Sequence, residues 1–169
     1  MNSQALIQRL AANREIFQAL VRGLTAEQSH WRPASDKWSM VEVINHLLDE
    51  EKDDFRRRLD LTLHSPDVPW PPIDPVGWAR DREYNRRELK PSVDAFLSER
   101  ERSLIWLESL VSPDWTAYRT HPAAGTLSAG DLLAAWVAHD FLHQRQISRL
   151  HWAYVAHLAA PYSVRYAGE

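Results

Sequence analysis

The sequence of 169 residues contains no cysteine. This absence excludes disulfide bonds and thiolate ligands, so a metal ion in this protein would have to be bound by histidine and carboxylate side chains. Strand-like alternation of apolar and polar residues is also essentially missing along the chain. The sequence therefore favours an all-α fold over a β-sheet fold.

An excess of positive charge and long apolar runs are missing as well. The formal charge is −3, and no basic stripe follows the run Arg56–Arg58, which argues against nucleic acid as the main partner and favours a small-molecule ligand. No apolar run approaches the ~20 residues of a membrane span, and Met1–Leu10 lacks the apolar core of a signal peptide. We therefore expect a cytoplasmic protein with no membrane segment.

Apolar residues recur at helical spacing in four segments of the chain. The length suits one domain, residues 1–169, with one substantial core. Residues at this spacing, in a chain without strand signals, predict a four-helix bundle. The four predicted helices span Leu6 to Leu24 with Gly23 as a stop signal, Ser39 to His64, Pro91 to Val111, and the segment after Ser128.

The connection between the second and third predicted helices is rich in proline. The segment Ser65–Pro75 contains five prolines, which cannot continue a helix and favour an extended chain. A domain linker is the alternative, but neither flank has enough helices to bury a core alone. We therefore predict a long crossover within one bundle.

Two sequence patterns mark where helices begin. Ser39 is followed three residues later by Glu42, and Ser128 is followed at the same spacing by Asp131. In such a capping box, the serine side chain accepts a hydrogen bond from the backbone N–H three residues later. The acidic side chain at that position accepts one from the backbone N–H of the serine. These patterns place the starts of the second and fourth helices.

Two histidines lie one helical turn apart in the fourth predicted helix. His139 and His143 project from the same face, about 6 Å apart along the axis, so both imidazoles could reach one metal ion at roughly 2.1 Å. Eight histidines placed at random in this length give roughly 0.4 such pairs, so the spacing alone is weak. The alternative is one buried histidine that binds a backbone carbonyl and a second at the surface.

A third histidine strengthens the metal hypothesis. His46 lies in the second predicted helix, where it shares one line with Val43 and Glu50 at the edge of the apolar stripe. An edge position suits a site that opens onto a pocket between helices. In a bundle, metal sites are made from inward side chains of facing helices, here one ligand from the second helix and two from the fourth.

Two polar residues are candidates for roles beside the metal. Glu50, one turn after His46, could orient that ring or act as a general base, although it could also be a solvated charge. Gln146, which follows His143, could bind a ligand ring or the substrate. Arg82, near Arg86 and Arg87, could contact an acidic cofactor or could simply be exposed surface. The other histidines lack a partner at ligand spacing: His30, His64, His121, His151 and His157.

Two segments resemble the DinB/YfiT-like superfamily of small bacterial metal-binding bundles, which is distinct from the DNA polymerase that shares part of the name. Trp38–Leu47 resembles the family's second-helix motif, and His139–Ile147 resembles its last-helix motif. The resemblance implies that these two histidines of the last helix and His46 coordinate one divalent ion, commonly zinc or nickel, together with water. Some relatives carry a further histidine beside the last ligand, where this chain has Leu142 and Gln144.

The resemblance implies a metal-dependent enzyme that acts on a small molecule. By family analogy alone, the first hypothesis is an S-transferase that activates a low-molecular-weight thiol, such as bacillithiol or mycothiol, on the metal. The alternatives are a hydrolase that uses a metal-activated water, a noncatalytic metal-binding bundle, and a metal-free interaction module. The eight tryptophans suit core and interface packing and are compatible with a homodimer.

Overall fold

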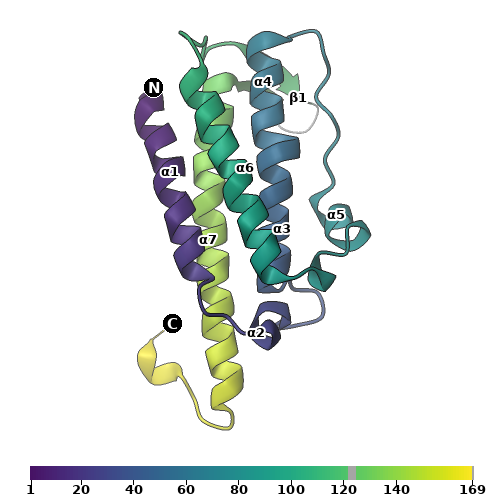
Figure 1. The fold of residues 1–169 in the computed structure, drawn as a ribbon, viewed down its shortest axis with the longest axis vertical. Coiled ribbons are helices and arrows are strands. Elements are labelled where there is room, and N and C mark those ends of the chain that lie inside the picture. The colour runs from purple at the N-terminus through teal and green to yellow at the C-terminus, as the bar shows by residue number, and fades with distance from the viewer. Residues whose placement is uncertain (122–124, 169) are drawn as a thin grey trace.

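Four long helical stretches pack side by side in the computed structural model, which describes residues 1–121 and 125–168 (Figure 1). The second stretch is continuous but contains three segments, α3, the π-helix η1 and α4. This architecture confirms the predicted all-α four-helix bundle. The long elements are α1 (Ser3–Leu20), α3 (Met40–Asp49), η1 (Glu50–Phe55), α4 (Arg56–His64), α6 (Leu89–Ser109) and α7 (Ala129–Ala159).

The starts of α3 and α7 follow the predicted capping boxes. Ser39 accepts a hydrogen bond from the backbone of Glu42, whose side chain binds the backbone N–H of Ser39 in return. Ser128 and Asp131 form the same reciprocal pair at α7. Each pair satisfies two N–H groups that a helix otherwise leaves without partners. The sequence therefore fixes the first turn of both helices that carry the predicted metal ligands.

The π-helix was not predicted from the sequence. Its wider turn begins at Glu50, one turn after His46, and three acidic residues in it are buried: Glu50, Glu51 and Asp54. An acidic run such as 49–54 ordinarily indicates a solvated surface, so its burial comes from contacts with other helices that local sequence does not reveal. Single π-turns within longer helices are frequent at functional sites.

Short elements occupy the connections. The segment 65–74 has neither helix nor strand, and α5 (Pro75–Asp81) follows it, with Pro75 in its first turn and Asp74 as its cap. The turn η2 (Tyr84–Arg86) completes this crossover, and the turn η3 (Arg165–Ala167) lies near the C-terminus. The short helix α2 (Ala26–His30) lies in the connection between the first and second predicted helices.

Two predicted helix ends are wrong by a few residues. The first helix ends at Leu20 and not at Leu24, because the chain already leaves helical geometry before Gly23, whose φ is +76°. The third helix ends at Ser109, and Val111 beyond it is 91% exposed. Apolar residues that follow a helix can continue its spacing without being part of its packed face.

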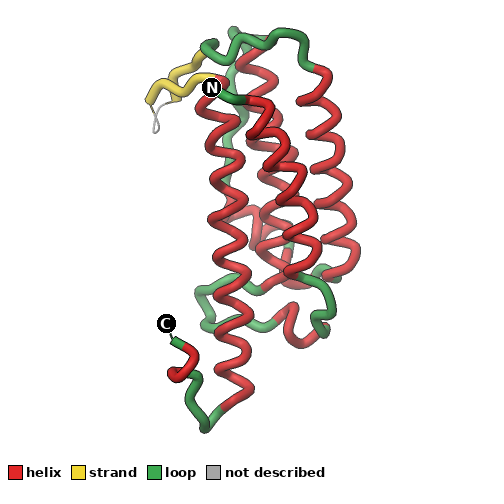
Figure 2. The backbone as a smooth tube through the Cα atoms, turned by 90° about the vertical axis from the view of Figure 1, so that its left-hand side faces the viewer, coloured by secondary structure: helices red, strands yellow, loops and turns green. Residues whose placement is uncertain are grey.

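A small hairpin corrects the expectation of an all-helical chain without strands. Strands β1 (Tyr118–His121) and β2 (Gly125–Ser128) pair antiparallel, with Tyr118 opposite Ser128. Each strand has only four residues and no fully buried position, so neither shows the alternation that a half-buried strand requires. The hairpin leads directly into α7, whereas the opposite end of α7 extends beyond the other long helices (Figure 2).

The apolar core has two clusters, separated along the helices by a polar layer. One cluster surrounds Leu10 and Trp136, and the other surrounds Phe17 and Ile147. Between them along α1 and α7 lie polar residues that are fully buried, including Asp140. Apolar residues of α7 on both sides of its histidine pair are buried: Leu132, Trp136, Ile147 and Leu150. Among the described residues, no helix combines the length and apolarity of a membrane span.

Candidate metal centre

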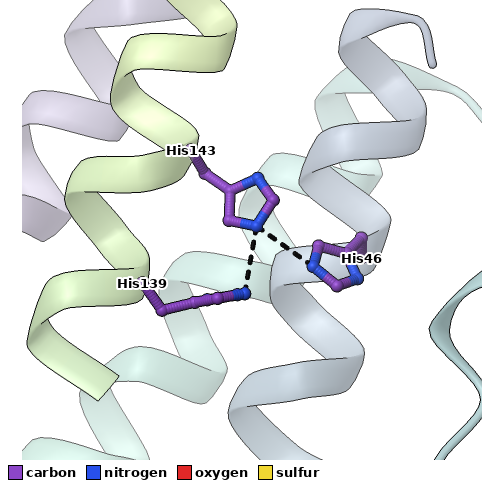
Figure 3. Close-up of side chains that lie close together, drawn as sticks. All are labelled: His46, His139 and His143. Atoms are coloured by element: carbon purple, nitrogen blue, oxygen red, sulfur yellow. Dashed lines mark hydrogen bonds between the residues drawn. The ribbon is translucent and has the colours of Figure 1, made fainter. Parts of the chain in front are cut away.

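The three histidines predicted as ligands lie together between α3 and α7. Figure 3 shows the rings of His46, His139 and His143 turned toward one another from the two helices. The Nε2 atom of His143 lies 3.1 Å from Nε2 of His46 and 3.0 Å from Nε2 of His139. His46 and His143 are 5% exposed, and His139 is half-buried. The structure thus brings together residues that are 97 positions apart in the sequence.

Local packing explains the burial of His46, which the sequence placed only at the edge of the apolar stripe. The Trp38 indole covers this imidazole, with ring centroids 4.9 Å apart. The Phe55 ring lies 5.0 Å from the ring of His139, which is on the facing helix α7. Trp38 precedes α3 and Phe55 ends η1, so the two aromatic side chains that cover the imidazoles come from positions before and after His46 in the sequence.

The imidazoles are held in their neutral form. Burial, followed by the effect of His143, lowers the pKa of His46 to about 3. Burial and the neighbouring imidazoles lower the pKa of His139 to about 2, and burial also lowers the pKa of His143. A neutral imidazole offers a lone pair to a metal ion, whereas a protonated one does not. All three rings are therefore in the form that binds metal at neutral pH.

Gln146 orients one of the rings. Its side-chain oxygen Oε1 lies 2.7 Å from Nδ1 of His143 and can only accept, so the imidazole donates through Nδ1–H. This hydrogen bond leaves the lone pair on Nε2, the atom that faces the other two histidines. Such a partner on the outer nitrogen fixes both the tautomer and the orientation of a metal-binding histidine.

Glu50 is buried beside His46 and is not a solvated charge, so that alternative is wrong. The carboxyl group is 4% exposed, and its Oε1 lies 3.8 Å from Nδ1 of His46. Burial and the nearby Asp54 carboxylate raise the pKa of Glu50 to about 8. Asp54 in turn forms an ion pair with Arg58 at 2.7 Å. The structure therefore places a carboxyl group that can hold a proton at neutral pH beside the histidine cluster.

Behind the histidines lies a buried ionic network that sequence analysis missed. The guanidinium of Arg100 binds Glu51 of η1 and Asp140 of α7, and all three side chains are about 1% exposed. Glu51 also accepts a hydrogen bond from the indole of Trp136 at 2.9 Å, and Asp140 accepts one from Asn13 at 3.0 Å. Glu51 directly follows Glu50 in the sequence, and Asp140 directly follows His139, but no local pattern marks an acidic residue as buried.

The remaining histidines lie elsewhere. His151, which continues along α7, contacts the backbone oxygen of Leu20 at 2.7 Å and the side chain of Gln28. His64 pairs with Asp60 at the surface. Within the described ranges, His46, His139 and His143 are the one group of three or more ligand-type side chains whose donor atoms lie within 4.8 Å of one another.

The donor set fits a divalent metal ion. Two nitrogens that each bind one ion at about 2.1 Å stand about 3.0 to 3.4 Å apart when they subtend an angle near 90° to 110°. The observed Nε2 separations of 3.0 and 3.1 Å fall in this range. Two Nε2 lone pairs at this distance repel each other unless a proton or a cation lies between them. Neutral imidazoles suit zinc, nickel and other ions of intermediate softness.

Comparisons with known proteins agree with this architecture. The chain is similar to a protein of Bacillus pumilus (strain SAFR-032) named "Putative metal-dependent hydrolase", with 26% identity over 149 residues that cover 87% of this chain and 83% of the relative. Among solved structures, it is similar to YfiT from Bacillus subtilis, described as a "probable metal-dependent hydrolase with an unusual four-helix bundle topology". That likeness has a TM-score of 0.77 at 19% identity and covers 88% of this chain and 85% of YfiT.

The family assignment follows from a match to most of the chain. The sequence profile described as the DinB superfamily matches residues 9–147, a range that begins in α1 and includes all three clustered histidines. This agrees with the resemblance carried by the two histidine-bearing segments. The chain belongs to the DinB superfamily.

Proposed function

We propose that His46, His139 and His143 bind one divalent metal ion, zinc or nickel, and that the chain is a metal-dependent enzyme acting on a small molecule. The observation that carries the proposal is the convergence of three neutral Nε2 atoms in a buried site. Three neutral ligands leave the full positive charge of the ion in place. When bound, such an ion supplies Lewis acidity that makes water, or a thiol, a nucleophile near neutral pH.

The chain's own residues have distinct roles in this proposal. Gln146 holds the ring of His143 so that its Nε2 lone pair points to the centre of the cluster. Glu50 lies next to Nδ1 of His46, and we assign it the task of accepting and returning a proton from the nucleophile. Trp38 and Phe55 exclude bulk water from two sides of the imidazoles, which strengthens electrostatic interactions inside the site.

Hydrolysis is the reaction we favour. The relative from Bacillus pumilus is named as a hydrolase, and the buried carboxyl group of Glu50 suits the activation of water in its deprotonated form, which dominates above a pKa of about 8. Thiol transfer, the first hypothesis from the family resemblance, uses the same ion and would need an external thiol because the chain has no cysteine. Neither relative reported above is described as a transferase, so thiol transfer stays a prediction.

An open coordination position distinguishes a catalytic centre from a structural one. Structural zinc is normally closed by four protein ligands, whereas catalytic zinc has three and leaves one position for water or substrate. Among the described residues, the cluster contains three ligand-type side chains. This number supports the catalytic proposal over a noncatalytic metal-binding bundle.

Metal analysis tests the site. We expect protein purified without an affinity tag to contain about one zinc or nickel ion per chain. His143→Ala and His46→Ala should lose most of it while the circular dichroism spectrum stays helical. His64→Ala is the matched control, because that histidine is exposed and should leave the metal content unchanged. Equal metal content in all four proteins would remove the proposed centre.

Activity measurements test the reaction. A panel of esters and amides should be hydrolysed only by metal-loaded protein and without added thiol. A parallel panel that combines an electrophile such as monochlorobimane with low-molecular-weight thiols tests the transfer reaction. Acceleration that needs both metal and thiol would replace hydrolysis by thiol transfer, and metal-loaded protein inactive in both panels would favour the noncatalytic alternative.

A further inference from the structure

A cavity lies beside η1 and α4, on the helical stretch that continues from α3. It has a volume of about 860 Å³ and is bounded by η1 and α4, by the proline-rich crossover with α5, and by α6. Among the described residues that line it, none belongs to α7 and none is a clustered histidine. The cavity is therefore separate from the proposed metal centre, although η1 contributes to both.

The side chains around this cavity are predominantly cationic. Five lysine or arginine residues line it against two aspartates, Asp53 and Asp60. A surplus of this kind creates a positive potential in a recess whose walls have a low dielectric constant. The five cationic residues are Lys52, Arg56, Arg57, Arg82 and Arg102.

Three of these cations are already neutralised. Arg56 and Arg102 both form ion pairs with Glu99, the latter at 3.0 Å. Arg82 lies between two carboxylates, at 2.6 Å from Asp49 and 3.1 Å from Asp53. Three acidic groups thus balance three guanidinium groups, and these pairs hold the walls of the cavity in place.

Lys52 and Arg57 supply the surplus charge. Both are exposed, and within the described part of the chain neither forms a hydrogen bond or ion pair with an acidic side chain. The remaining lining acid, Asp60, already contacts His64 at 2.9 Å. The cavity therefore presents two cations without acidic partners beside three arginines that are already paired. Two unpaired cations complement a ligand with one or two negative charges.

Flat apolar groups form part of the same lining. The indoles of Trp78 and Trp106 are half-buried, on α5 and α6 respectively. The guanidinium of Arg82 lies 4.3 Å from the ring of Trp78, a cation–π contact that fixes this indole. Pro71 and Pro72 of the crossover add rigid apolar surface. Aromatic and prolyl walls favour a flat ring in the ligand.

We infer that this cavity binds a small organic anion, a flat ring that carries a carboxylate, with Lys52 and Arg57 binding the acidic group and the two indoles contacting the ring. Of the three arginines that the sequence offered for an acidic cofactor, Arg82 lies here but is paired, whereas Arg86 and Arg87 line other surfaces. The inference does not depend on the proposed metal chemistry.

A matched pair of ligands tests the inference. Indole-3-acetate and the neutral tryptophol carry the same ring and differ in the acidic group. In titrations of ¹⁵N-labelled, metal-loaded protein, we expect indole-3-acetate to shift the indole N–H signals of Trp78 and Trp106. We expect it to bind about tenfold more tightly than tryptophol, because charged hydrogen bonds to the acid are lost. Inorganic phosphate alone should bind more weakly than indole-3-acetate.

Two double variants test the role of the two unpaired cations, one at the cavity and one elsewhere as the control. Lys52→Gln with Arg57→Gln should reduce the affinity for indole-3-acetate about tenfold, to that of tryptophol. Arg9→Gln with Arg149→Gln removes the same charge from exposed sites elsewhere and should leave the affinity within about twofold. All four positions are on the surface, so the variants should fold. Equal binding of the two ligands, equal loss in both double variants, or shifts centred on Trp38 at the metal centre would overturn the inference.

Discussion

Arg100 and Asp140 form a bidentate ion pair in the interior of the bundle, with Nη1 2.7 Å from Oδ2 and Nη2 2.8 Å from Oδ1. The same guanidinium binds both carboxylate oxygens of Glu51 at 2.8 Å. Asp140 follows His139, and Glu51 follows Glu50, so one side chain of α6 connects the two segments that carry the candidate site. This arrangement fixes how α7 faces η1.

Replacing Arg100 should destabilise the protein strongly. Arg100→Met leaves two buried carboxylates without their cation, and breaking a buried ion pair in this way costs about 3–5 kcal/mol. We expect the urea midpoint to fall accordingly, and the metal affinity to fall with it because His139 and Glu50 lose their common support. Adding Glu51→Gln and Asp140→Asn to Arg100→Met removes the stranded charges and should recover a large part of the loss. A change below about 1 kcal/mol in the single variant would show that the network contributes little.

Gln146 should matter for metal affinity and little for folding. Gln146→Leu removes the acceptor of the Nδ1–H group of His143, and loss of such a partner typically weakens metal binding by 10- to 100-fold. Competition with a chromophoric chelator measures this affinity. Gln144→Leu is the control, because the Gln144 side chain is also half-buried but makes no hydrogen bond to the histidines. Equal weakening in the two variants would contradict the assigned role.

Glu50→Gln separates proton transfer from metal binding. The amide keeps the shape of the carboxyl group but cannot accept the proton, so the catalytic rate should fall by about 10² to 10⁴-fold at unchanged metal content. Asp60→Asn on the same helical stretch, which changes a half-buried carboxylate outside the histidine cluster, should leave the rate within about twofold. If Glu50→Gln retained full activity with metal bound, the general-base role would be ruled out.

The predictable part of this structure is encoded in local patterns. The capping boxes at Ser39 and Ser128 fix two helix starts, and the four-residue spacing of His139 and His143 fixes a shared face. The position of His46 relative to that pair was inferred from bundle geometry and family resemblance together. The capping boxes and the histidine spacing depend on residues within one or two turns, which is why the sequence was sufficient for them.

The unpredicted part depends on contacts between distant segments. The buried Glu51 and Asp54 stand in a run that looks solvated, and only Arg100 of α6 and Arg58 of α4 explain their burial. The π-helix has no sequence marker of its own, and the hairpin strands are too short and too exposed to show alternation. A buried charge becomes recognisable only when its partner, up to 49 residues away, is known.

The stability of the metal-free protein should pass through a maximum near pH 6.5. His46 and His139 have ordinary pKa values of 6.5 that folding lowers to about 3 and about 2, so their stabilising contribution is present above pH 6.5 and lost as the pH falls. Glu50 acts in the opposite direction, because folding raises its pKa from 4.5 to about 8 and its contribution is lost as the pH rises through that value. Between pH 4.5 and 6.5 the unfolded chain binds two more protons at the histidines and one fewer at Glu50. From these three groups, the free energy of unfolding should therefore rise by about 1.4 kcal/mol per pH unit in this window and fall above it. His143, whose pKa folding also lowers, adds to the rise.

Urea denaturation in the presence of EDTA from pH 4.5 to 8 measures this profile. Glu50→Gln should abolish the decline between pH 6.5 and 8, because the group whose ionisation destabilises the folded state is gone. His46→Gln should reduce the loss toward acid pH, because one of the two histidines that take up a proton on unfolding is absent. A flat profile in the unmodified protein would mean that these three side chains reach solvent in the folded state, and the buried, convergent cluster would then be wrong.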